Sequence, residues 1–280
     1  MLYMTLGGMY RAEGNLEKSI ECYQKAHEFS SELISYQLLS NYELGHNYYL
    51  AGNWSKAIEL FESYIFESNS PNFKAYGGYK LGVCYWMVDG ENAIDKITDL
   101  YKKVINEWKR PNLSYDAYAA RHCQKFISSG GYSKLEELFI KISNFQEGNL
   151  LEQASEILVD IEKLMQDYEN SSKTISDNDK ALYLYWKGHL YQKLDKRVDA
   201  LKSFNSLIQM ADKVKEDTWI IPYAELESVE IFIKNKDFAK AHMVIEMVKK
   251  RSNYDFEKHV SMRCKKLHSK IERHSNEHKK

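Results

Sequence analysis

Apolar residues recur three and four positions apart along most of the chain, and a small residue stands at a fixed place in each recurrence. From Tyr3 to Ala26 the order is Y-x-x-L-G-x-x-Y-x-x-x-G-x-x-x-x-S-x-x-x-Y-x-x-A. Three further copies and a last, degenerate one follow: Leu44, Gly45, Tyr48, Gly52, Ala57 and Phe61; Leu81, Gly82, Tyr85, Ala93 and Ile97; Gly188, Tyr191, Ala200 and Phe204; Phe232, Lys236, Asp237, Phe238 and Ala241. This spacing predicts amphipathic helices joined in pairs.

Each of the four clear copies has a glycine near the middle of its first helix. Glycine in a helix interior costs about 1 kcal/mol relative to alanine, so we expect it where a larger residue would block a helix crossing. The small residue of the second helix is expected to lie opposite this glycine at the crossing. The expected pairs are Gly7 with Ser19, Gly45 with Ala57, Gly82 with Ala93 and Gly188 with Ala200.

Turn residues fall where the paired helices need breaks. Gly14-Asn15 and Gly52-Asn53 are expected to end one helix and begin the next. Two of the three prolines, Pro71 and Pro111, stand between repeats, and Pro222 occupies a first-turn position where its missing N–H is harmless. No proline interrupts an expected helix.

The pattern resembles the tetratricopeptide repeat, a pair of antiparallel helices with small and large residues alternating at fixed positions. The resemblance covers nearly the whole chain. It implies an all-α fold, a right-handed α-solenoid of helical hairpins. Only 13 Gly and 3 Pro in 280 residues agree with this, because sheets need turn residues at almost every reversal.

The repeats divide the chain into six expected segments. Hairpins one to three cover residues 1–110, and degenerate helical hairpins cover 111–169. A polar linker is expected over 170–180, and two further hairpins over 181–255. A capping helix then covers 256–275, and 276–280 is expected to fray. Because the chain starts inside a helix with Leu2, Met4 and Leu6, we expect a fragment or short isoform of a longer array, the alternative being another subunit over that end.

Composition and charge argue against nucleic acid as a partner and against a transmembrane segment. The chain has 39 Lys and Arg against 40 Asp and Glu, which gives no overall electrostatic attraction for nucleic acid. A mean hydropathy of −0.57 and the lack of a long apolar run argue against a transmembrane segment. The first ten residues lack the pattern of a signal peptide. The scattered Cys22, Cys84, Cys123 and Cys264 are expected to be reduced and mostly buried, as in a cytoplasmic protein.

Motifs for catalysis, cofactors and metals are absent, so we predict a non-enzymatic protein with no cofactor. The glycine pairs lack the context of a phosphate-binding loop, and no nucleophile elbow occurs. His122 and Cys123 are adjacent, and adjacent helical residues point in different directions. His274 and His278 have a zinc-like spacing, but Cys264 has no second cysteine nearby, so a solvated tail is preferred.

Aromatic residues at the fifth and twelfth positions of the first helices are the candidate binding residues. In tetratricopeptide repeats these positions tend to line an inner groove, and Tyr and Trp are frequent anchors at interfaces. The alternative is that some of the rings pack against neighbouring repeats. Histidines at the ninth position complete the set. The candidates are Tyr42, His46, Tyr49, Tyr79, Trp86, Tyr185 and His189.

A narrower resemblance concerns residues 216–271. The runs E-D-T-W-I-I-P-Y-A-E-L-E, K-D-F-A-K-A and S-N-Y-D-F-E-K-H-V-S-M-R are similar to the C-terminal end of the tetratricopeptide repeat protein 39 family, which includes a fungal inclusion-body clearance protein. Tyr254, Glu257 and Arg263 match its closing signature, while His259 replaces an expected arginine. The resemblance implies an adaptor linked in some members to lipid or sterol homeostasis.

The leading hypothesis is a scaffold or adaptor that binds a protein or peptide partner in its groove. One alternative is a peripheral lipid-associated factor, because residues 259–280 hold seven Lys or Arg and two Glu. Another is a peptide-sensing repeat regulator that inhibits an enzyme.

Overall fold

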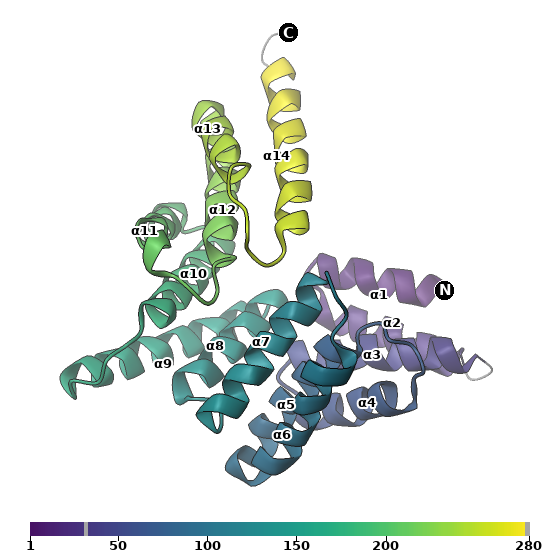
Figure 1. Ribbon diagram of the computed structural model, residues 1–280. Coiled ribbons are helices and arrows are strands. Elements are labelled where there is room, and N and C mark those ends of the chain that lie inside the picture. Colours follow the sequence, from purple (N-terminus) through teal and green to yellow (C-terminus); the bar gives the residue numbers. More distant parts are fainter. Residues whose placement is uncertain (31–32, 278–280) are drawn as a thin grey trace. The chain divides into compact units, whose positions relative to one another are not determined.

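The computed structural model describes residues 1–30 and 33–277, and the side chains among them through residue 273. All regular secondary structure in this described part of the chain is helical, which confirms the predicted all-α, tetratricopeptide-type solenoid fold. The chain forms two compact units, residues 1–154 and 155–280 (Figure 1), so the division falls inside one long helix.

The first unit begins with three helical hairpins. Each pairs a first helix with a second one, and each second helix packs against the first helix of the next hairpin. The pairs are α1 (Leu2–Ala12) with α2 (Leu16–Glu28), α3 (Ile34–Leu50) with α4 (Trp54–Glu67), and α5 (Lys74–Asp89) with α6 (Ile94–Lys103). The 3₁₀ turn Gly90–Ala93 precedes α6, and the π-helical turn Val104–Trp108 follows it.

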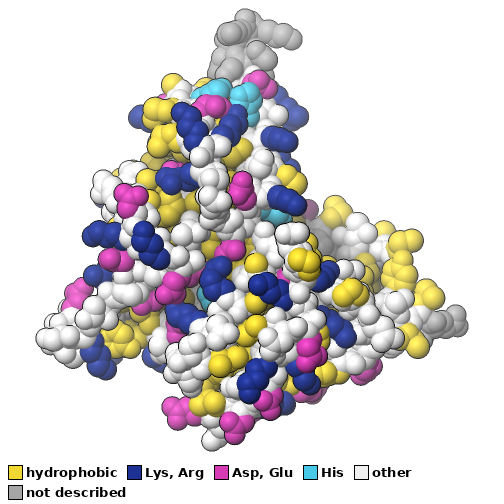
Figure 2. All heavy atoms as spheres, in the orientation of Figure 1, with side chains coloured by type: hydrophobic (Ala, Val, Ile, Leu, Met, Phe, Trp, Pro, Cys, Tyr) yellow, Lys and Arg dark blue, Asp and Glu magenta, His cyan; other side chains and the backbone are white. Residues whose placement is uncertain are grey.

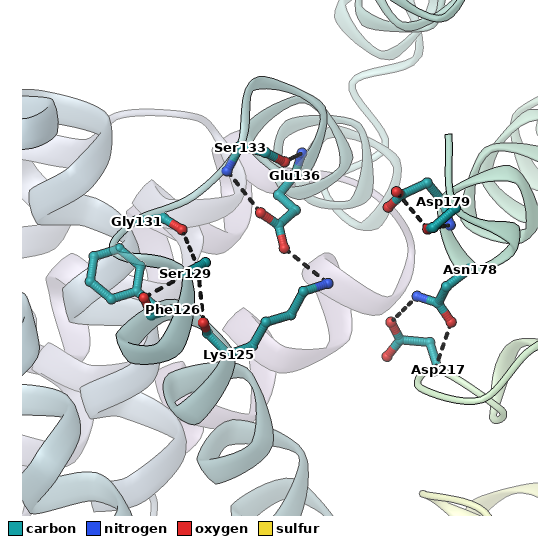
Figure 3. Close-up of polar contacts among 10 residues, drawn as sticks. Lys125, Phe126, Ser129, Gly131, Ser133, Glu136, Asn178, Asp179 and Asp217 are labelled. Carbon is teal, nitrogen blue, oxygen red and sulfur yellow. Dashed lines mark hydrogen bonds and ion pairs between the residues drawn. The ribbon is translucent and has the colours of Figure 1, made fainter. Parts of the chain in front are cut away.

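Residues 111–169 form helices but not the hairpins that we expected. Helix α7 (Ser114–Ser129) packs on α5 and α6 as the first helix of a fourth repeat. Helix α8 (Lys134–Glu147) begins with a capping box between Ser133 and Glu136, and Lys125 of α7 pairs with Glu136 at 3.0 Å (Figure 3). Instead of returning along α7, α8 then packs against α3. Helix α9 (Leu151–Asn170) follows.

The second unit contains two helical hairpins and a C-terminal capping helix. Helix α10 (Asp177–Lys193) pairs with α11 (Arg197–Gln209), and α12 (Ile220–Lys234) pairs with α13 (Phe238–Val248). The 3₁₀ turn Ala211–Lys213 lies between the two hairpins. The polar linker is shorter than the expected 170–180, because Ser176 caps α10 and Ile175 is buried. Asn178 and Asp217 join α10 to the loop before α12 through hydrogen bonds of 3.2 Å (Figure 3).

The capping helix α14 (Glu257–Glu277) packs against α12 and α13. Four apolar side chains spaced three and four residues apart, Val260, Cys264, Leu267 and Ile271, are buried in the resulting core. Arg263 pairs with Glu227 at 2.7 Å and with Glu230 at 2.6 Å, so the helix is also held by charge. Of the tail expected to fray, residues 276–277 are helical and 278–280 lie outside the described residues.

The mid-helix glycines lie at helix crossings, as predicted, but an aromatic ring covers each of them. A Cβ on Gly7 would lie 2.8 Å from the Tyr23 ring, and one on Gly82 would lie 2.2 Å from Tyr101. Phe61 and Phe204 cover Gly45 and Gly188 in the same way. The expected small partners are buried nearby: Ser19, Ala57, Ala93 and Ala200 are at most 4% exposed. The small residue therefore lets the helices approach, and the ring on the second helix fills the space above the glycine.

The Gly-Asn turns and Pro222 lie at the positions expected from the sequence. Gly14 and Gly52 have φ of +77° and +72°, a conformation that favours glycine. The side chains of Asn15 and Asn53 accept hydrogen bonds from backbone N–H groups three residues on and so cap α2 and α4. Pro222 stands in the first turn of α12.

The distribution of charged and apolar side chains on the surface agrees with the near-zero net charge of the chain. Lys and Arg side chains alternate with Asp and Glu over the face drawn in Figure 2. At the first hairpin Leu2 and Met9 are 69% and 54% exposed, as expected for an open face of α1. All four cysteines are free and buried. Within the described part of the chain, no helix is both long and apolar enough to cross a membrane.

Candidate partner-binding groove

The candidate groove of the first unit is formed by the first helices of the three hairpins, α1, α3 and α5. We call this surface the groove face and define it by Arg11 of α1, Glu43, His46 and Tyr49 of α3, and Lys80 and Trp86 of α5. Three of these residues, His46, Tyr49 and Trp86, were candidates from the sequence. The other three are charged and were missed.

The aromatic candidates of the first unit are packed inside it. Tyr42, Tyr49, Tyr79 and Trp86 are all less than 9% exposed. Tyr42 packs between Phe73 and Tyr64, with ring centroids 4.9 and 5.0 Å away. Burial raises the pKa of the Tyr42, Tyr49 and Tyr79 hydroxyls, so these phenols are neutral. Of the two interpretations left open by the sequence, packing between repeats therefore describes these rings.

The two remaining candidates lie in the second unit, at a second location. Tyr185 is 4% exposed and packs edge-on against Trp219, with ring centroids 5.4 Å apart. His189 stacks on Tyr185 at 6.0 Å. Burial is the main cause that lowers the pKa of His189 to about 4, so its imidazole is neutral near pH 7. The remaining contacts of the candidate site lie in the first unit.

Helix α8 lies on the groove face and contacts the C-terminal parts of the first helices. The indole Nε1 of Trp86 donates a hydrogen bond to Glu137 Oε1 at 2.8 Å. The side-chain amide of Asn144 donates to the carbonyl oxygen of Tyr49 at 3.4 Å. Just after the helix, Asn149 donates to the carbonyl oxygen of Gly14 at 3.5 Å. The segment thus contacts the third, second and first hairpins in turn, antiparallel to their order in the chain.

Close approach accompanies these hydrogen bonds. A Cβ on Gly131 would lie 2.7 Å from Trp86, and one on Gly52 would lie 3.1 Å from Phe145. At the other end of α8, a Cβ on Gly148 would lie 3.3 Å from Leu16 and 3.4 Å from Leu50. Ile140, on the same side of α8 as Asn144, packs against the core of the stacked hairpins. On the opposite side of the helix Leu135, Leu138, Phe139 and Ile142 are at most 5% exposed. The groove face therefore contacts one side of a helix that is buried on both sides.

A charged cluster lies beside the C-terminal end of α8. Lys80 Nζ is 3.0 Å from His46 Nδ1, and His46 Nε2 is 3.4 Å from Glu147 Oε1. A lysine ammonium group can only donate, so Nδ1 accepts from Lys80 and Nε2 carries the proton directed at Glu147. A neutral imidazole therefore connects a buried cation to a carboxylate. Next to it, Arg11 pairs with Glu43 at 2.7 Å.

The protonation of this cluster follows from burial and from the neighbouring charges. Burial lowers the pKa of Lys80 to about 8 and outweighs the opposing effect of Glu147 and Glu43. Burial and then Lys80 lower the pKa of His46, which agrees with the neutral imidazole. At Glu147 partial desolvation favours the neutral acid, but the hydrogen bond from His46 and the charges around it lower the pKa to about 2. Glu147 is 56% exposed, so water reaches this carboxylate.

Lys80 could have been found in the sequence. It is the one charged residue between Ala75 and Met87, in a segment otherwise made of apolar, aromatic and glycine residues. Such a lysine is either paired or functional, since Lys is almost never fully buried alone. Here it is 3% exposed, and its ammonium group lies 4.3 Å from the Tyr76 ring centroid as well as beside His46. Glu147 gives no comparable signal, because its partners are 67 and 101 residues earlier.

Residues 1–65 match the family model described as the tetratricopeptide repeat. The match extends from α1 to near the end of α4 and so includes Arg11, His46 and Tyr49 of the groove face. Repeats of this kind form extended surfaces that generally mediate protein–protein interactions, and they are typically non-enzymatic. The first two hairpins are thus similar in both sequence and structure to tetratricopeptide repeats.

Proposed function

We propose that this chain is a non-enzymatic scaffold or adaptor whose groove face binds a helical segment of a partner protein. The observation that supports this most directly is α8, a helix that contacts Trp86, Tyr49 and His46 of the groove face. The repeat match over residues 1–65 supports the same class of function.

The stacked hairpins suit this function because the binding surface is formed before a partner arrives. Tyr49 and Trp86 are fixed by neighbouring rings: Tyr49 meets Trp54 edge-on at 5.4 Å, and Trp86 meets Phe126 at 5.6 Å. A rigid surface loses little conformational entropy on binding. The buried rings therefore act by positioning the groove, and Arg11, Glu43 and His46 supply its polar contacts.

Nucleophilic catalysis has no support from the cysteines. Cys84 and Cys123 are fully buried, and burial raises the pKa of both thiols well above the ordinary value. The thiolate is the reactive form, so these groups are unreactive in the folded chain. Their burial also suits the cytoplasmic location that we propose.

The structure gives little support to the alternative in which the basic C-terminal helix binds lipid. An amphipathic helix binds membranes by inserting its apolar face. In α14 that face, which includes Val260, Leu267 and Ile271, is buried against α12 and α13. Our proposal accordingly does not extend to lipid or sterol homeostasis.

Site-specific photo-crosslinking tests the proposed function. Leu39 of α3 lies one helical turn before Glu43 of the groove face and lines a cavity of about 480 Å³, which leaves room for a photoreactive phenylalanine analogue. The matched control places the analogue at Lys96 on the second helix α6, where the side chain is 59% exposed. We expect a protein that co-purifies with the intact chain to crosslink from position 39 and not from 96. Equal crosslinking from both positions, or from 96 alone, would contradict the groove proposal.

A further inference from the structure

The cavity beside Leu39 lies at the N-terminal part of α3, away from α8. Helix α8 contacts the C-terminal part of α3, at His46 and Tyr49. The first turns of α3, the last turn of α4 and the loop that leads to α5 enclose the cavity of about 480 Å³. Ligand-binding pockets commonly have about 300–1,000 Å³, so a large side chain of a partner fits here while α8 stays in place.

The inner wall of the cavity is apolar and includes a strained residue. Leu38 and Tyr64 of this wall are buried, whereas Phe73 is 41% exposed and its ring stacks on Tyr42, with centroids 4.9 Å apart. Phe73 has a φ of +61°, a conformation that is uncommon for a bulky residue. Such strain persists only where the surrounding structure fixes it, and it is concentrated at functional sites. The backbone here holds an exposed aromatic ring at the edge of a cavity.

Hydrogen bonds fix the loop between α4 and α5, which forms one side of the cavity. The backbone N–H of Ser70 donates to Ser68 Oγ at 3.1 Å, and that of Asn72 donates to Ser70 Oγ at 3.2 Å. The Tyr64 hydroxyl donates to the carbonyl oxygen of Asn72. Arg110 Nη1 donates to the side-chain oxygen of Asn72 at 2.7 Å. The cavity is therefore formed before a ligand binds, which lowers the entropic cost of binding.

Glu67 gives the cavity a negative charge. Among the described residues that line the cavity, Glu67 alone has a charged side chain. This side chain is exposed, and within the described part of the chain it forms no ion pair. The C-terminal end of α4 and the N-terminal end of α3 also lie here, but their partial charges are opposite in sign and about half an elementary charge each. These two contributions nearly cancel, so the carboxylate determines the sign of the site.

The polar atoms on the rim suit a donor of hydrogen bonds. Ser35 and Asn69 line the cavity with exposed side chains whose oxygen atoms can accept. Ammonium and guanidinium groups only donate, and the face of an aromatic ring such as that of Phe73 attracts a cation. A lysine or arginine beside an apolar anchor therefore matches the carboxylate, the rim and the inner wall together.

We propose that this cavity binds a partner helix that presents a large apolar side chain and, three or four residues away, a lysine or arginine. This inference rests on the proposed function and specifies the partner's chemistry. The apolar side chain packs on Leu38, Leu39 and Phe73, and the cation pairs with Glu67. A spacing of three or four residues places the two side chains on one face of the partner helix.

Peptide selection on the full chain supplies the probe. A phage-displayed library of random short peptides is panned on the natural chain, and phages that also bind the variant Ser35→Trp are discarded. Ser35 is exposed and lines the cavity, so a tryptophan there fills the cavity without displacing a buried side chain. We expect the remaining peptides to share a large apolar residue with Lys or Arg three or four positions away. Remaining peptides that lack this pair, or the absence of any remaining peptide, would overturn the proposal.

Fluorescence anisotropy with a labelled copy of a selected peptide then tests the charge pair. Glu67→Gln should weaken binding by roughly tenfold or more, because the cation loses its carboxylate. The matched control Glu59→Gln, at an exposed position about two turns earlier on α4, should leave the affinity unchanged. Glu67→Lys should restore binding to a peptide in which Glu replaces the cation. Equal affinity for the natural chain and Glu67→Gln, or an equal loss in the control, would overturn the proposal.

The outcome can be told apart from a failure of the proposed function. A co-purified partner that crosslinks from position 39, yet binds Glu67→Gln as tightly as the natural chain, would support the groove function and overturn the charge pair. Crosslinking of the partner from position 96 alone would contradict the groove function even where selected peptides depend on Glu67. Each result therefore bears on one proposal separately from the other.

Discussion

The hydroxyl of Ser19 donates a hydrogen bond of 2.7 Å to the carbonyl oxygen of Gly7. The same oxygen of Ser19 accepts a hydrogen bond of 2.7 Å from the side-chain amide of Asn47 in the next hairpin. One buried serine therefore joins the two helices of the first hairpin and connects them to the second. This is possible because Gly7 has no side chain, which lets the Tyr23 ring lie directly over it.

Two adjacent glycines in α1 should respond to alanine in opposite directions. A Cβ on Gly7 would lie 2.8 Å from the rigid ring of Tyr23, which is 2% exposed, so Gly7→Ala should destabilise the chain by about 1–3 kcal/mol. A Cβ on Gly8 would lie 3.5 Å from the Tyr23 hydroxyl, an ordinary contact. Gly8→Ala should stabilise by about 0.5–1 kcal/mol through helix propensity. Urea unfolding measures both, and a loss of stability at Gly8 as large as at Gly7 would refute the crossing contact.

The buried Lys80 predicts how stability changes with pH. Its pKa is about 8 in the folded chain and near 10.5 when unfolded, so between these values the unfolded chain binds more protons. The contribution of Lys80 to the free energy of unfolding therefore rises with pH above 8, by up to about 1.4 kcal/mol per pH unit. Comparing the natural chain with Lys80→Met from pH 7.5 to 9.5 isolates this effect. Parallel profiles for the two chains would rule out the lowered pKa.

Arg263 should be the main charged attachment of the capping helix. Its guanidinium group contacts Glu227 and Glu230 of α12, and Glu227 is only 5% exposed. Arg263→Met leaves this buried carboxylate without its ion-pair partner, so we expect a loss of about 3–5 kcal/mol. Arg263→Met combined with Glu227→Met should recover part of the loss, because the unpaired charge is gone. A double-mutant cycle by chemical denaturation measures the coupling, and additive effects would exclude it.

The two sides of α14 should differ in their roles. Leu267→Ala removes a buried side chain and should cost about 2–5 kcal/mol. Lys265→Glu with Lys266→Glu changes exposed positions and should leave stability within about 0.5 kcal/mol. The double charge reversal also tests the lipid hypothesis while it keeps the fold. Flotation with anionic liposomes should be equally low for both chains, whereas flotation of the natural chain alone would revive that hypothesis.

The hairpins could be predicted because their determinants are local. The Gly14-Asn15 turn, the N-cap of Asn53 and the first-turn position of Pro222 each act within a few residues, and the structure confirms them. That the second helix of the hairpin crosses the first at Gly45 could be predicted from the same repeat pattern. What covers that glycine was less evident, because a small residue such as Ala57 and the ring of Phe61 four positions later lie on one helix face.

The candidate site was predicted only in part. The sequence pointed to positions on the first helices, yet it could not distinguish a ring that lines a groove from one that packs between repeats, as Tyr42 and Tyr79 do. Both environments favour an apolar ring at the same spacing. Segment 111–169 was misjudged for a related reason: the periodicity of α8 shows that one side is buried, but not against which helix.

The all-α hairpins, their turns and the glycine crossings follow from the amino-acid sequence alone, since each depends on contacts within about one repeat. The folded structure was needed to show that α8 lies on the groove face, that Lys80 is buried beside His46, and that Glu147 balances their charge. These contacts join residues that are far apart in the chain. Their energy depends on how successive hairpins stack, and the helical periodicity of the sequence does not indicate how they stack.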